Sequence, residues 1–501
     1  MKKAILMGLP IMSICLILSC GKDDGPTPDP EPQEVEIASF SPTSGTVGTE
    51  VTINGKNFSS TKEENNVTFG SFKAPVVEAS PTKLVVQVPT NAVTGKITVT
   101  VGSSSATSAT NFEVLIFPGS LSIDDFQPKE GDFGTIVFID GSNFSAVLSE
   151  NTVKFGDVQA EVTDATTSKL TVKVPSGANT NLISVTVADH TTETAEYFQL
   201  PVWRTLNDFS GSPRRNAFSC VVDGNAYVGM GIGDGNFYDI WSYDQNGDSW
   251  SNTESAYPGK GNTDPAEFVL DGKVYVLDGL EGGLGLWTNE FRSYDVATNE
   301  WTNLPNFSGS VRYRAIDFTL QGKGYVVGGI SSENTFMADV WEYDSQEGTW
   351  TEKTPYPQPE GIYNMASFII DDHAYVGAGG VGPLSSSADF YKFDGVDWTP
   401  IASLPESAHS RVGPVGFSIN GKGYIGLGRN VENYLMLQDF YEYDPGTDVW
   451  TQIEDFPSVP RYLATAFVLD GKAYVGLGDA GGDLDEQQDI YLFDPANIAP
   501  Q

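Results

Sequence analysis

The sequence is poor in histidine, cysteine and basic residues. Its 501 residues include three His and three Cys, and 28 Lys and Arg stand against 66 Asp and Glu, a net charge of −38. A chain this acidic is a poor partner for nucleic acid or for an anionic membrane surface. The scarcity of His and Cys leaves little from which to build a metal site, so we expect neither a bound metal nor a cofactor.

The first 19 residues have the features of a secretory signal peptide. A lysine pair precedes an apolar stretch from Ala4 to Leu18 and the small Ser19, and a polar tract follows directly, so this segment is expected to be cleaved rather than to span a membrane. Residues 17–20 (ILSC) resemble a bacterial lipobox. That resemblance implies that Cys20 becomes the lipidated amino terminus, and an ordinary cleaved signal with an incidental Cys20 is the alternative.

Residues 20–36 read as an acidic, Pro-rich tether. Residues 21–24 (GKDD) resemble the acidic export tag of surface lipoproteins in glycan-degrading Gram-negative bacteria, and the proline-rich run after them favours extended backbone. The resemblance implies a lipid-anchored protein of the outer membrane that faces the cell exterior. With Cys20 acylated, the mature chain keeps one free thiol, Cys220, which excludes an internal disulfide and a cysteine-based metal site.

Residues 37–115 and 119–200 repeat one unit at an offset of 86 residues. The matched pairs include Phe40 and Phe126, Asn57 and Asn143, Phe69 and Phe155, Val88 and Val174, and Phe112 and Phe198. Short β-branched runs alternate with Gly, Asn, Ser and Pro turns, as a small antiparallel sandwich requires. The stretch SPTSGTVGTEVTINGKNF resembles TIG (IPT) immunoglobulin-like domains. Neither unit clusters aromatic residues in a loop, so both are interpreted as spacers, with a binding role as the alternative.

A second period, of about fifty residues, runs through residues 201–498. A hairpin of the form V-x-D/N-G-K-x-Y-V-G recurs with its tyrosine at Tyr227, Tyr275, Tyr325, Tyr375, Tyr424 and Tyr474. Each unit continues with an acidic residue four positions before an aromatic–Asp pair. Four short strands in such a period are typical of a propeller blade. The glycine pairs, the Tyr-Asp pair and the tryptophan resemble Kelch repeats, so the expected fold is all-β: two Ig-like sandwiches followed by a six-bladed Kelch-type propeller.

The tryptophans predict how the propeller ring closes. Five units carry the repeated tryptophan, at Trp250, Trp301, Trp350, Trp398 and Trp450. The sixth unit stops at Phe493 and Asp494 without one, whereas Trp203 stands alone before the first hairpin. We therefore expect the strand around Trp203 to complete blade six. Cys220 replaces the inner-strand phenylalanine of the other blades, which predicts an inert packing role for its thiol.

Residues that break the repeat are the candidates for function. On a Kelch ring, the segments entering the inner strands and the loops between the second and third strands converge on one face. Four entering segments carry an arginine interpreted as structural: Arg214, Arg312, Arg411 and Arg461. The variable positions after it and one Gly-rich loop supply the candidate glycan-binding residues Arg215, Trp287, Tyr313, Arg314, Tyr363, Asn364 and Tyr462. Aromatic rings stack on the apolar face of a pyranose, while Arg and Asn bind hydroxyl groups.

The lipid anchor, export tag, Ig-like spacers and C-terminal domain together resemble the glycan-binding lipoproteins of polysaccharide-uptake systems. That resemblance implies non-catalytic glycan binding by a surface lipoprotein of a carbohydrate-uptake system. The expected partners are a glycan and the membrane, through the lipid, but no nucleic acid; an outer-membrane glycan transporter complex is a further candidate. A sugar-modifying enzyme similar to the Kelch mutarotase-epimerases is one alternative, with Glu267 and Asp317 on adjacent inner strands as its acid and base. A protein–protein adhesion module is another. A copper site like that of galactose oxidase is excluded, because Cys220 occupies a core position.

Overall fold

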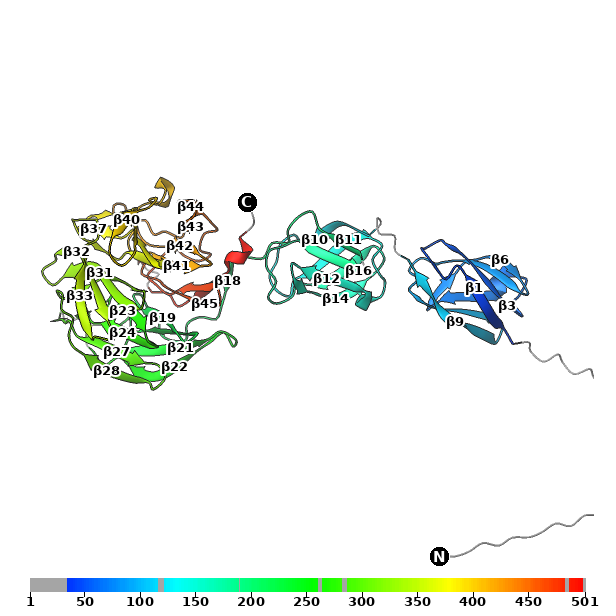
Figure 1. The fold of residues 1–501 in the computed structure, drawn as a ribbon, viewed down its shortest axis with the longest axis horizontal. Helices are drawn as coiled ribbons and strands as arrows, with labels where there is room; N and C mark the ends of the chain where they lie inside the picture. Colours follow the sequence, from blue (N-terminus) through cyan, green and yellow to red (C-terminus); the bar gives the residue numbers. More distant parts are fainter. Residues whose placement is uncertain are drawn as a thin grey trace, which may run out of the picture.

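The computed structural model describes residues 34–115, 121–188, 190–259, 264–281, 286–482 and 486–498. The regular structure of these ranges is β-strand, interrupted by short 3-10 helices. Figure 1 shows two small sandwiches and a propeller in a row. The expected signal peptide, Cys20 and the export tag lie outside the described residues. Within the described ranges, no helix has the length and apolar character needed to cross a membrane.

The first sandwich packs a four-stranded sheet against a five-stranded one. The order β1-β3-β7-β6 is built from β1 (Glu36–Ser41), β3 (Glu50–Lys56), β6 (Val76–Ser80) and β7 (Lys83–Gln87). The order β2-β9-β8-β4-β5 is built from β2 (Ser44–Gly45), β4 (Asn65–Phe69), β5 (Phe72–Ala74), β8 (Gly95–Val101) and β9 (Ser104–Val114), with η1 (Lys62–Glu64) before β4. The inward-facing side chains form a core in which the rings of Phe69 and Phe112 lie 5.0 Å apart.

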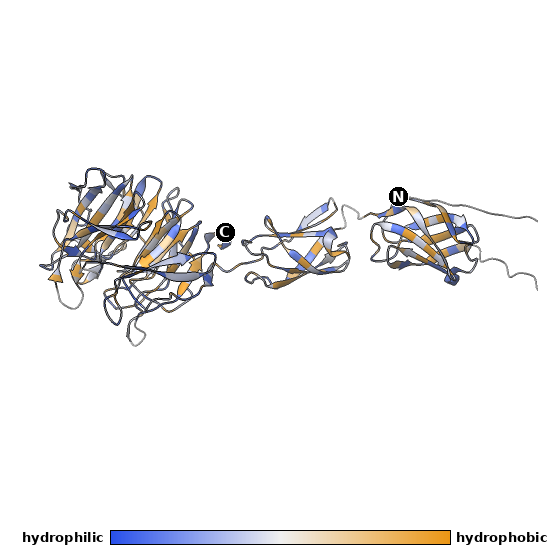
Figure 2. Ribbon diagram, turned by 90° about the horizontal axis from the view of Figure 1, so that it is seen from below, coloured by the Kyte–Doolittle hydropathy of each residue, from blue (hydrophilic) through white to orange (hydrophobic). Residues whose placement is uncertain are grey.

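The second sandwich repeats this architecture with two four-stranded sheets. The order β10-β11-β15-β14 is built from β10 (Ser122–Gln127), β11 (Ile136–Ser142), β14 (Glu161–Ala165) and β15 (Lys169–Lys173). The order β13-β12-β16-β17 is built from β12 (Asn151–Phe155), β13 (Val158–Gln159), β16 (Ile183–Val187) and β17 (His190–Glu193), with η2 (Leu148–Glu150) before β12. Its core places Phe155 against Phe198 at 5.1 Å, the pair expected from the repeat. Figure 2 shows apolar and polar residues alternating along the strands.

The propeller has six antiparallel blades in the described part of the chain. Blade one consists of β19 (Phe218–Val222), β20 (Asn225–Gly229), β21 (Asp239–Asp244) and β22 (Ser249–Ala256). Blade two consists of β23 (Ala266–Leu270), β24 (Lys273–Leu277), β27 (Phe291–Asp295) and β28 (Glu300–Leu304). Blade three consists of β30 (Ile316–Leu320), β31 (Lys323–Ser331), β32 (Phe336–Asp344) and β33 (Thr349–Lys353). Blade four consists of β35 (Ala366–Ile370), β36 (His373–Gly377), β39 (Phe390–Phe393) and β40 (Trp398–Pro400). Blade five consists of β41 (Val415–Ile419), β42 (Lys422–Gly426), β43 (Phe440–Asp444) and β44 (Val449–Gln452). Blade six consists of β45 (Thr465–Leu469), β46 (Lys472–Gly476), β47 (Ile490–Phe493) and β18 (Trp203–Thr205). Short strands at one end of the blades are β25 (Leu280–Glu281), β26 (Leu286–Trp287), β29 (Arg312–Tyr313), β34 (Ile362–Tyr363), β37 (Gly380–Val381) and β38 (Ser385–Ser386), and the 3-10 helices are η3 (Glu406–Ala408) and η5 (Pro495–Asn497).

The ring closes as the tryptophan pattern predicts. Strand β18 pairs with β47, and Trp203 lies opposite Phe493. The indole ring is 4.9 Å from the rings of Phe440 and Phe493, and its Nε1 donates a hydrogen bond of 3.1 Å to the carbonyl of Glu454. Blade six is therefore assembled from both ends of the propeller, which are held in one sheet.

Repeated aromatic residues pack each blade against the next, as expected. The hairpin tyrosine of one blade contacts the aromatic–Asp pair of its neighbour: Tyr275 is 5.5 Å from Tyr343, and Tyr474 is 5.2 Å from Tyr243 across the seam. In blade one, Cys220 takes the inner-strand position that phenylalanine has in the other blades. It is buried there and lies opposite the hairpin Tyr227 in the β19–β20 register. Burial raises the pKa of the Cys220 thiol, which keeps it protonated and unreactive.

The four repeated arginines are structural. Each guanidinium is buried and makes two bonds to the acidic residue that precedes the aromatic–Asp pair, as in Arg312, whose nitrogens lie 2.8 and 2.7 Å from the Asp339 carboxylate. The same guanidinium donates to the carbonyl of Gly328 at 3.0 Å. Such a planar, bidentate pair fixes the entering segment to the blade, because both ions are satisfied within it.

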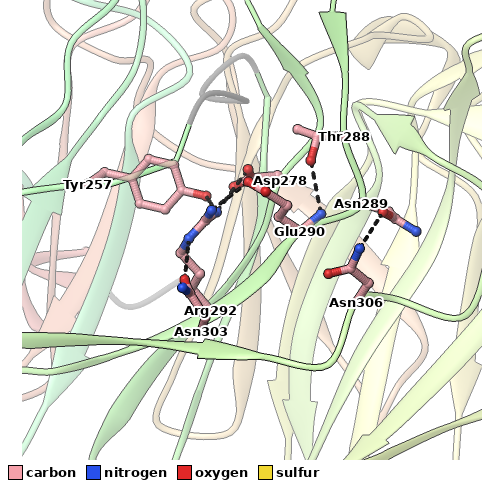
Figure 3. Close-up of polar contacts among 8 residues, drawn as sticks. All are labelled: Tyr257, Asp278, Thr288, Asn289, Glu290, Arg292, Asn303 and Asn306. Atoms are coloured by element: carbon pink, nitrogen blue, oxygen red, sulfur yellow. Dashed lines mark hydrogen bonds and ion pairs between the residues drawn. The ribbon is translucent and has the colours of Figure 1, made fainter.

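Blade two has a comparable buried arginine–carboxylate pair, but its arginine comes from a different position. Arg292 lies on β27, where the corresponding residue in blades one and three is a tryptophan. Its guanidinium bonds Asp278, the Tyr257 hydroxyl and Asn303 at 2.9–3.0 Å, and it also pairs with Glu290 (Figure 3). Arg292 thus supplies, within blade two, an ion-paired arginine comparable to the entering arginines of the other blades.

The second sandwich is joined to the propeller by specific contacts. The side-chain oxygen of Asn497, in η5, accepts from the amide of Thr180 at 3.0 Å, and its nitrogen donates to the carbonyl of Pro201 at 2.9 Å. Arg204 lies 4.3 Å over the Phe133 ring. The sandwich adds no strand to the propeller, as expected, but it does share polar and aromatic contacts with it.

Candidate functional site

A ring of six residues with left-handed backbone surrounds the channel mouth. One residue per blade ends the entering segment, and the six are Asn216, Asp264, Arg314, Asn364, Gly413 and Leu463, with φ between 47° and 61°. Backbone hydrogen bonds of 2.9–3.3 Å join five neighbouring pairs around this mouth ring, from the amide of one blade to the carbonyl of the preceding blade. The backbone is therefore fixed at the mouth, so the ring presents its side chains, all but that of Gly413, from fixed points.

A cavity of about 140 Å³ lies at the mouth ring. All six ring residues line it, together with Glu267 and Asp317. Among the described residues, the side-chain amides of Asn216 and Asn364 have no hydrogen-bond partner. Each amide offers both a donor and an acceptor, so this pair can bind hydroxyl groups of a ligand.

Glu267 and Asp317 occupy equivalent positions on β23 and β30, which belong to adjacent blades. Burial raises the pKa of the Glu267 carboxyl well above its usual range, and the Asp317 charge raises it further, while a backbone hydrogen bond from Ser219 opposes the shift. Burial likewise raises the pKa of Asp317. The neutral form of both groups is therefore favoured, so the pair can hold a proton beneath the mouth.

Aromatic residues surround the mouth ring on its outer side. Trp287, in the β25–β26 hairpin, meets Tyr313 edge to face at 5.2 Å. Arg314 lies 4.9 Å over the same tyrosine ring. The structure thus brings together three candidates from two blades, and both aromatic rings remain half-exposed. Tyr462 is also half-exposed on this side, in blade six.

Tyr363 differs from the other predicted aromatic residues because only 8% of its surface is exposed. Its ring lies 5.4 Å from Phe336 and over Gly380, where any Cβ would come within 2.2 Å of the Tyr363 ring. The position of Gly380 is taken by an isoleucine in blades one and three, Ile232 and Ile330. Tyr363 therefore fills a gap in the repeat, and little of its ring is left for a ligand.

Two of the predicted arginines already have acidic partners. The Arg215 guanidinium pairs with Asp479 at 3.2 Å and with Glu486, both in blade six. Arg314 pairs with Asp264, its neighbour on the mouth ring, at 3.1 Å. Their charges are balanced within the protein, so the nitrogens left over can contact hydroxyl groups but carry little net attraction for an anion.

Sequence reasoning missed Arg429, which lies beside this group. Its guanidinium stacks 4.5 Å over the Tyr462 ring and 5.6 Å over the Tyr434 ring. Tyr434 is 69% exposed. The sequence did contain a signal for Arg429, because it breaks the repeat. The fifth residue after the hairpin tyrosine is apolar in the first four blades and charged in the last two: Ile232, Leu280, Ile330, Gly380, Arg429 and Asp479.

A larger cavity, of about 760 Å³, lies at the junction of the second sandwich and the propeller. It is lined by the linker residues 199–202 and by Glu130 and Glu454. Its lining includes the amides of Gln199 and Asn497 but no aromatic ring, and the Asn497 amide already bonds Thr180 and Pro201, so we assign the candidate site to the mouth. Within the described ranges, no group of three or more His, Cys, Asp or Glu side chains could hold a metal ion.

The fold and the mouth define a class: a multidomain all-β protein in which two TIG sandwiches precede a Kelch propeller. Residues 36–114 and 121–200 match the IPT/TIG domain, and residues 266–478 match the KLHDC2/KLHL20/DRC7 Kelch-repeats domain. The propeller is also similar to the solved structure described as the structure of YjhT, with a TM-score of 0.50 and 17% identity over 58% of this chain and 98% of that one. This likeness concerns the fold.

Two curated relatives illustrate the range of similar proteins. Kelch-like protein 35 of Mus musculus is 26% identical over 260 residues, which cover 52% of this chain and 42% of that protein. The N-acetylneuraminate epimerase of Pasteurella multocida (strain Pm70) is 35% identical over 105 residues, which cover 20% of this chain and 26% of the enzyme. The chain thus spans less than half the length of either relative.

Proposed function

We propose that this protein binds glycan at the mouth of its Kelch propeller, as a lipid-anchored protein of the bacterial cell surface. The binding face is formed by the half-exposed rings of Trp287, Tyr313 and Tyr462, and the side-chain amides of Asn216 and Asn364 lie at its centre. The two TIG domains hold this face away from the anchor at Cys20. A carbohydrate-uptake system is the setting in which such a protein would act.

The observation that carries the proposal is the combination of exposed rings and unpaired amides at one mouth. Sugar rings present an apolar face that stacks on aromatic side chains, and hydroxyl groups that need directional partners. Asn216 and Asn364 stand at fixed points because the mouth ring is tied by backbone hydrogen bonds. A preorganised donor and acceptor set binds without the cost of ordering flexible side chains.

The test is affinity electrophoresis of the full chain on a panel of polysaccharides, followed by calorimetry with the best oligosaccharide. Trp287→Ala is expected to weaken binding about tenfold or more, judged from the loss of about 1–3 kcal/mol when a base-stacking aromatic is removed. Tyr197→Ala is the matched control, because Tyr197 is an exposed aromatic residue of the second sandwich. Equal loss in both variants, or none in Trp287→Ala, would contradict a site at the mouth.

A sugar-isomerising enzyme is the second candidate. It is favoured by the raised pKa of Glu267 and Asp317 beneath the mouth and by the similarity to a protein named N-acetylneuraminate epimerase. A carboxyl pair that holds a proton could donate and accept at a sugar carbon or ring oxygen. Glu267→Gln and Asp317→Asn separate the two functions: conversion of a bound sugar that both substitutions abolish establishes the enzyme, whereas binding without turnover establishes the receptor.

A further inference from the structure

Arg429 is the one mouth arginine whose charge is not balanced by a described residue. Its side chain makes two ring contacts, with Tyr462 and Tyr434, and its buried Nε has no hydrogen-bond partner. By contrast, Arg215 pairs with two carboxylates and Arg314 with one. An arginine held on aromatic faces keeps its planar donor edge for a further group, because stacking does not use the N–H bonds in its plane.

The position of Arg429 links it to the mouth. Its backbone exchanges two hydrogen bonds of 2.9 Å with Val412, the residue before Gly413 of the mouth ring. Burial raises the pKa of Tyr363 and of Tyr462, and the Asp479 charge raises that of Tyr462 further, whereas the Arg429 charge opposes the shift at both rings. The exposed ring of Tyr434 also lies 5.6 Å from the guanidinium. A group that approaches Arg429 therefore meets aromatic surfaces suited to a sugar ring.

We propose that Arg429 is an anion-recognising subsite and that the glycan preferred by this protein carries a carboxylate or sulfate group. This inference rests on the proposed glycan-binding function. The guanidinium binds the anion through charge-assisted hydrogen bonds, two at a time where the geometry allows, while Tyr462 and Tyr434 contact the sugar that bears it. The net charge of −38 repels acidic glycans at long range, but at physiological ionic strength charges more than about 8 Å away are largely screened.

The experiment compares three oligosaccharides of equal length by calorimetry: a neutral oligogalactose, an oligogalacturonate and a sulfated oligogalactose. The variants of the full chain are Arg429→Met, which keeps most of the side-chain volume, and Arg429→Lys, which keeps the charge. Lys173→Met is the matched control, because it removes one positive charge from an exposed site in the second sandwich. Intrinsic tryptophan fluorescence checks that each variant is folded.

The wild type is expected to bind at least one acidic oligosaccharide about tenfold or more tightly than the neutral one, the range of a charge-assisted hydrogen bond. Arg429→Met should abolish this preference and leave the neutral affinity within about twofold, Arg429→Lys should keep part of it, and Lys173→Met should keep all of it. The carboxylated and sulfated arms show which anion the site takes. A wild type without preference, or a preference that survives Arg429→Met, overturns the inference.

Sodium sulfate separates this inference from the proposed function. The melting temperature of the wild type and of Arg429→Met is measured in sulfate and in chloride at matched ionic strength. If no oligosaccharide binds but sulfate stabilises the wild type more than the variant, the anion subsite stands and the glycan function fails. If the two proteins respond equally and no oligosaccharide binds, both proposals fall.

Discussion

Removing the Trp203 indole tests whether the seam at blade six holds the propeller together. The side chain is 5% exposed and contacts three aromatic rings, those of Phe440, Phe456 and Phe493. Truncation of a buried tryptophan to alanine costs about 3–5 kcal/mol from lost transfer free energy and the cavity left behind. The carbonyl of Glu454 also loses its indole donor. We therefore expect Trp203→Ala to lower the free energy of unfolding of the propeller by this amount.

The assay is urea denaturation followed by tryptophan fluorescence. All nine tryptophans lie between Trp203 and Trp450, so the signal reports on the propeller and not on the sandwiches. Trp287→Ala is the matched control: it removes one half-exposed indole from a hairpin outside the blade sheets and is expected to cost less than about 1 kcal/mol. A Trp203→Ala variant as stable as this control would refute the closure reasoning.

Truncated chains give an independent test of the same seam. A chain beginning after Leu206 lacks β18, so β47 becomes an unpaired edge and we expect aggregation. A chain beginning at Leu200 keeps β18 and should remain soluble, with a modest loss of stability because the Thr180–Asn497 hydrogen bond is absent. Equal solubility and equal unfolding midpoints for the two chains would show that β18 does not close the ring.

Three further outcomes are expected. Glu267→Gln should leave the free energy of unfolding unchanged at pH 4 and raise it at pH 8–9. A carboxyl whose folded pKa is raised loses its stabilising contribution as pH rises through that pKa, by up to about 1.4 kcal/mol per pH unit. Urea unfolding at several pH values checks this, with exposed Glu300→Gln as the control, and parallel pH profiles of variant and wild type would contradict it. Cys20→Ala should release the protein from the membrane fraction, whereas replacing residues 22–24 (KDD) should keep it membrane-bound but protected from protease added to whole cells. Asn497→Ala should loosen the sandwich–propeller junction, seen as faster limited proteolysis near Pro201, because two hydrogen bonds are lost there.

The repeat made the propeller framework predictable. The hairpin tyrosines and the four entering arginines recur at a fixed spacing. Each of these arginines makes the same ion pair in its own blade, whereas a hairpin tyrosine such as Tyr275 packs against the next blade. The closure by Trp203 followed from the number of repeated tryptophans. Five of the six units carry one, so the strand with the sixth had to come from elsewhere in the chain. Local periodicity thus specifies contacts that are repeated by the fold.

The charge balance at the mouth could not be read from the sequence. The partners of Arg215 lie 264 and 271 residues away, and they meet it because blades one and six become neighbours when the ring closes. The burial of Tyr363 depends on Phe336 and on the missing side chain at Gly380. Such pairings between single, unrepeated residues leave no periodic signal, so candidates chosen by residue type alone included two arginines whose charges are already neutralised.

The contrast between the structural and the unpaired arginines locates function in this propeller. Arg214, Arg312, Arg411 and Arg461 are buried with every charge matched, and Arg292 shows that blade two recovers the lock even when the entering arginine is missing. The fold therefore has a strong requirement for satisfied guanidinium groups. Against that requirement, a buried Nε without a partner at Arg429 costs stability, about 1–3 kcal/mol for an unsatisfied polar group. The aromatic residues beside Arg429 indicate where a ligand for its unpaired guanidinium donors would lie.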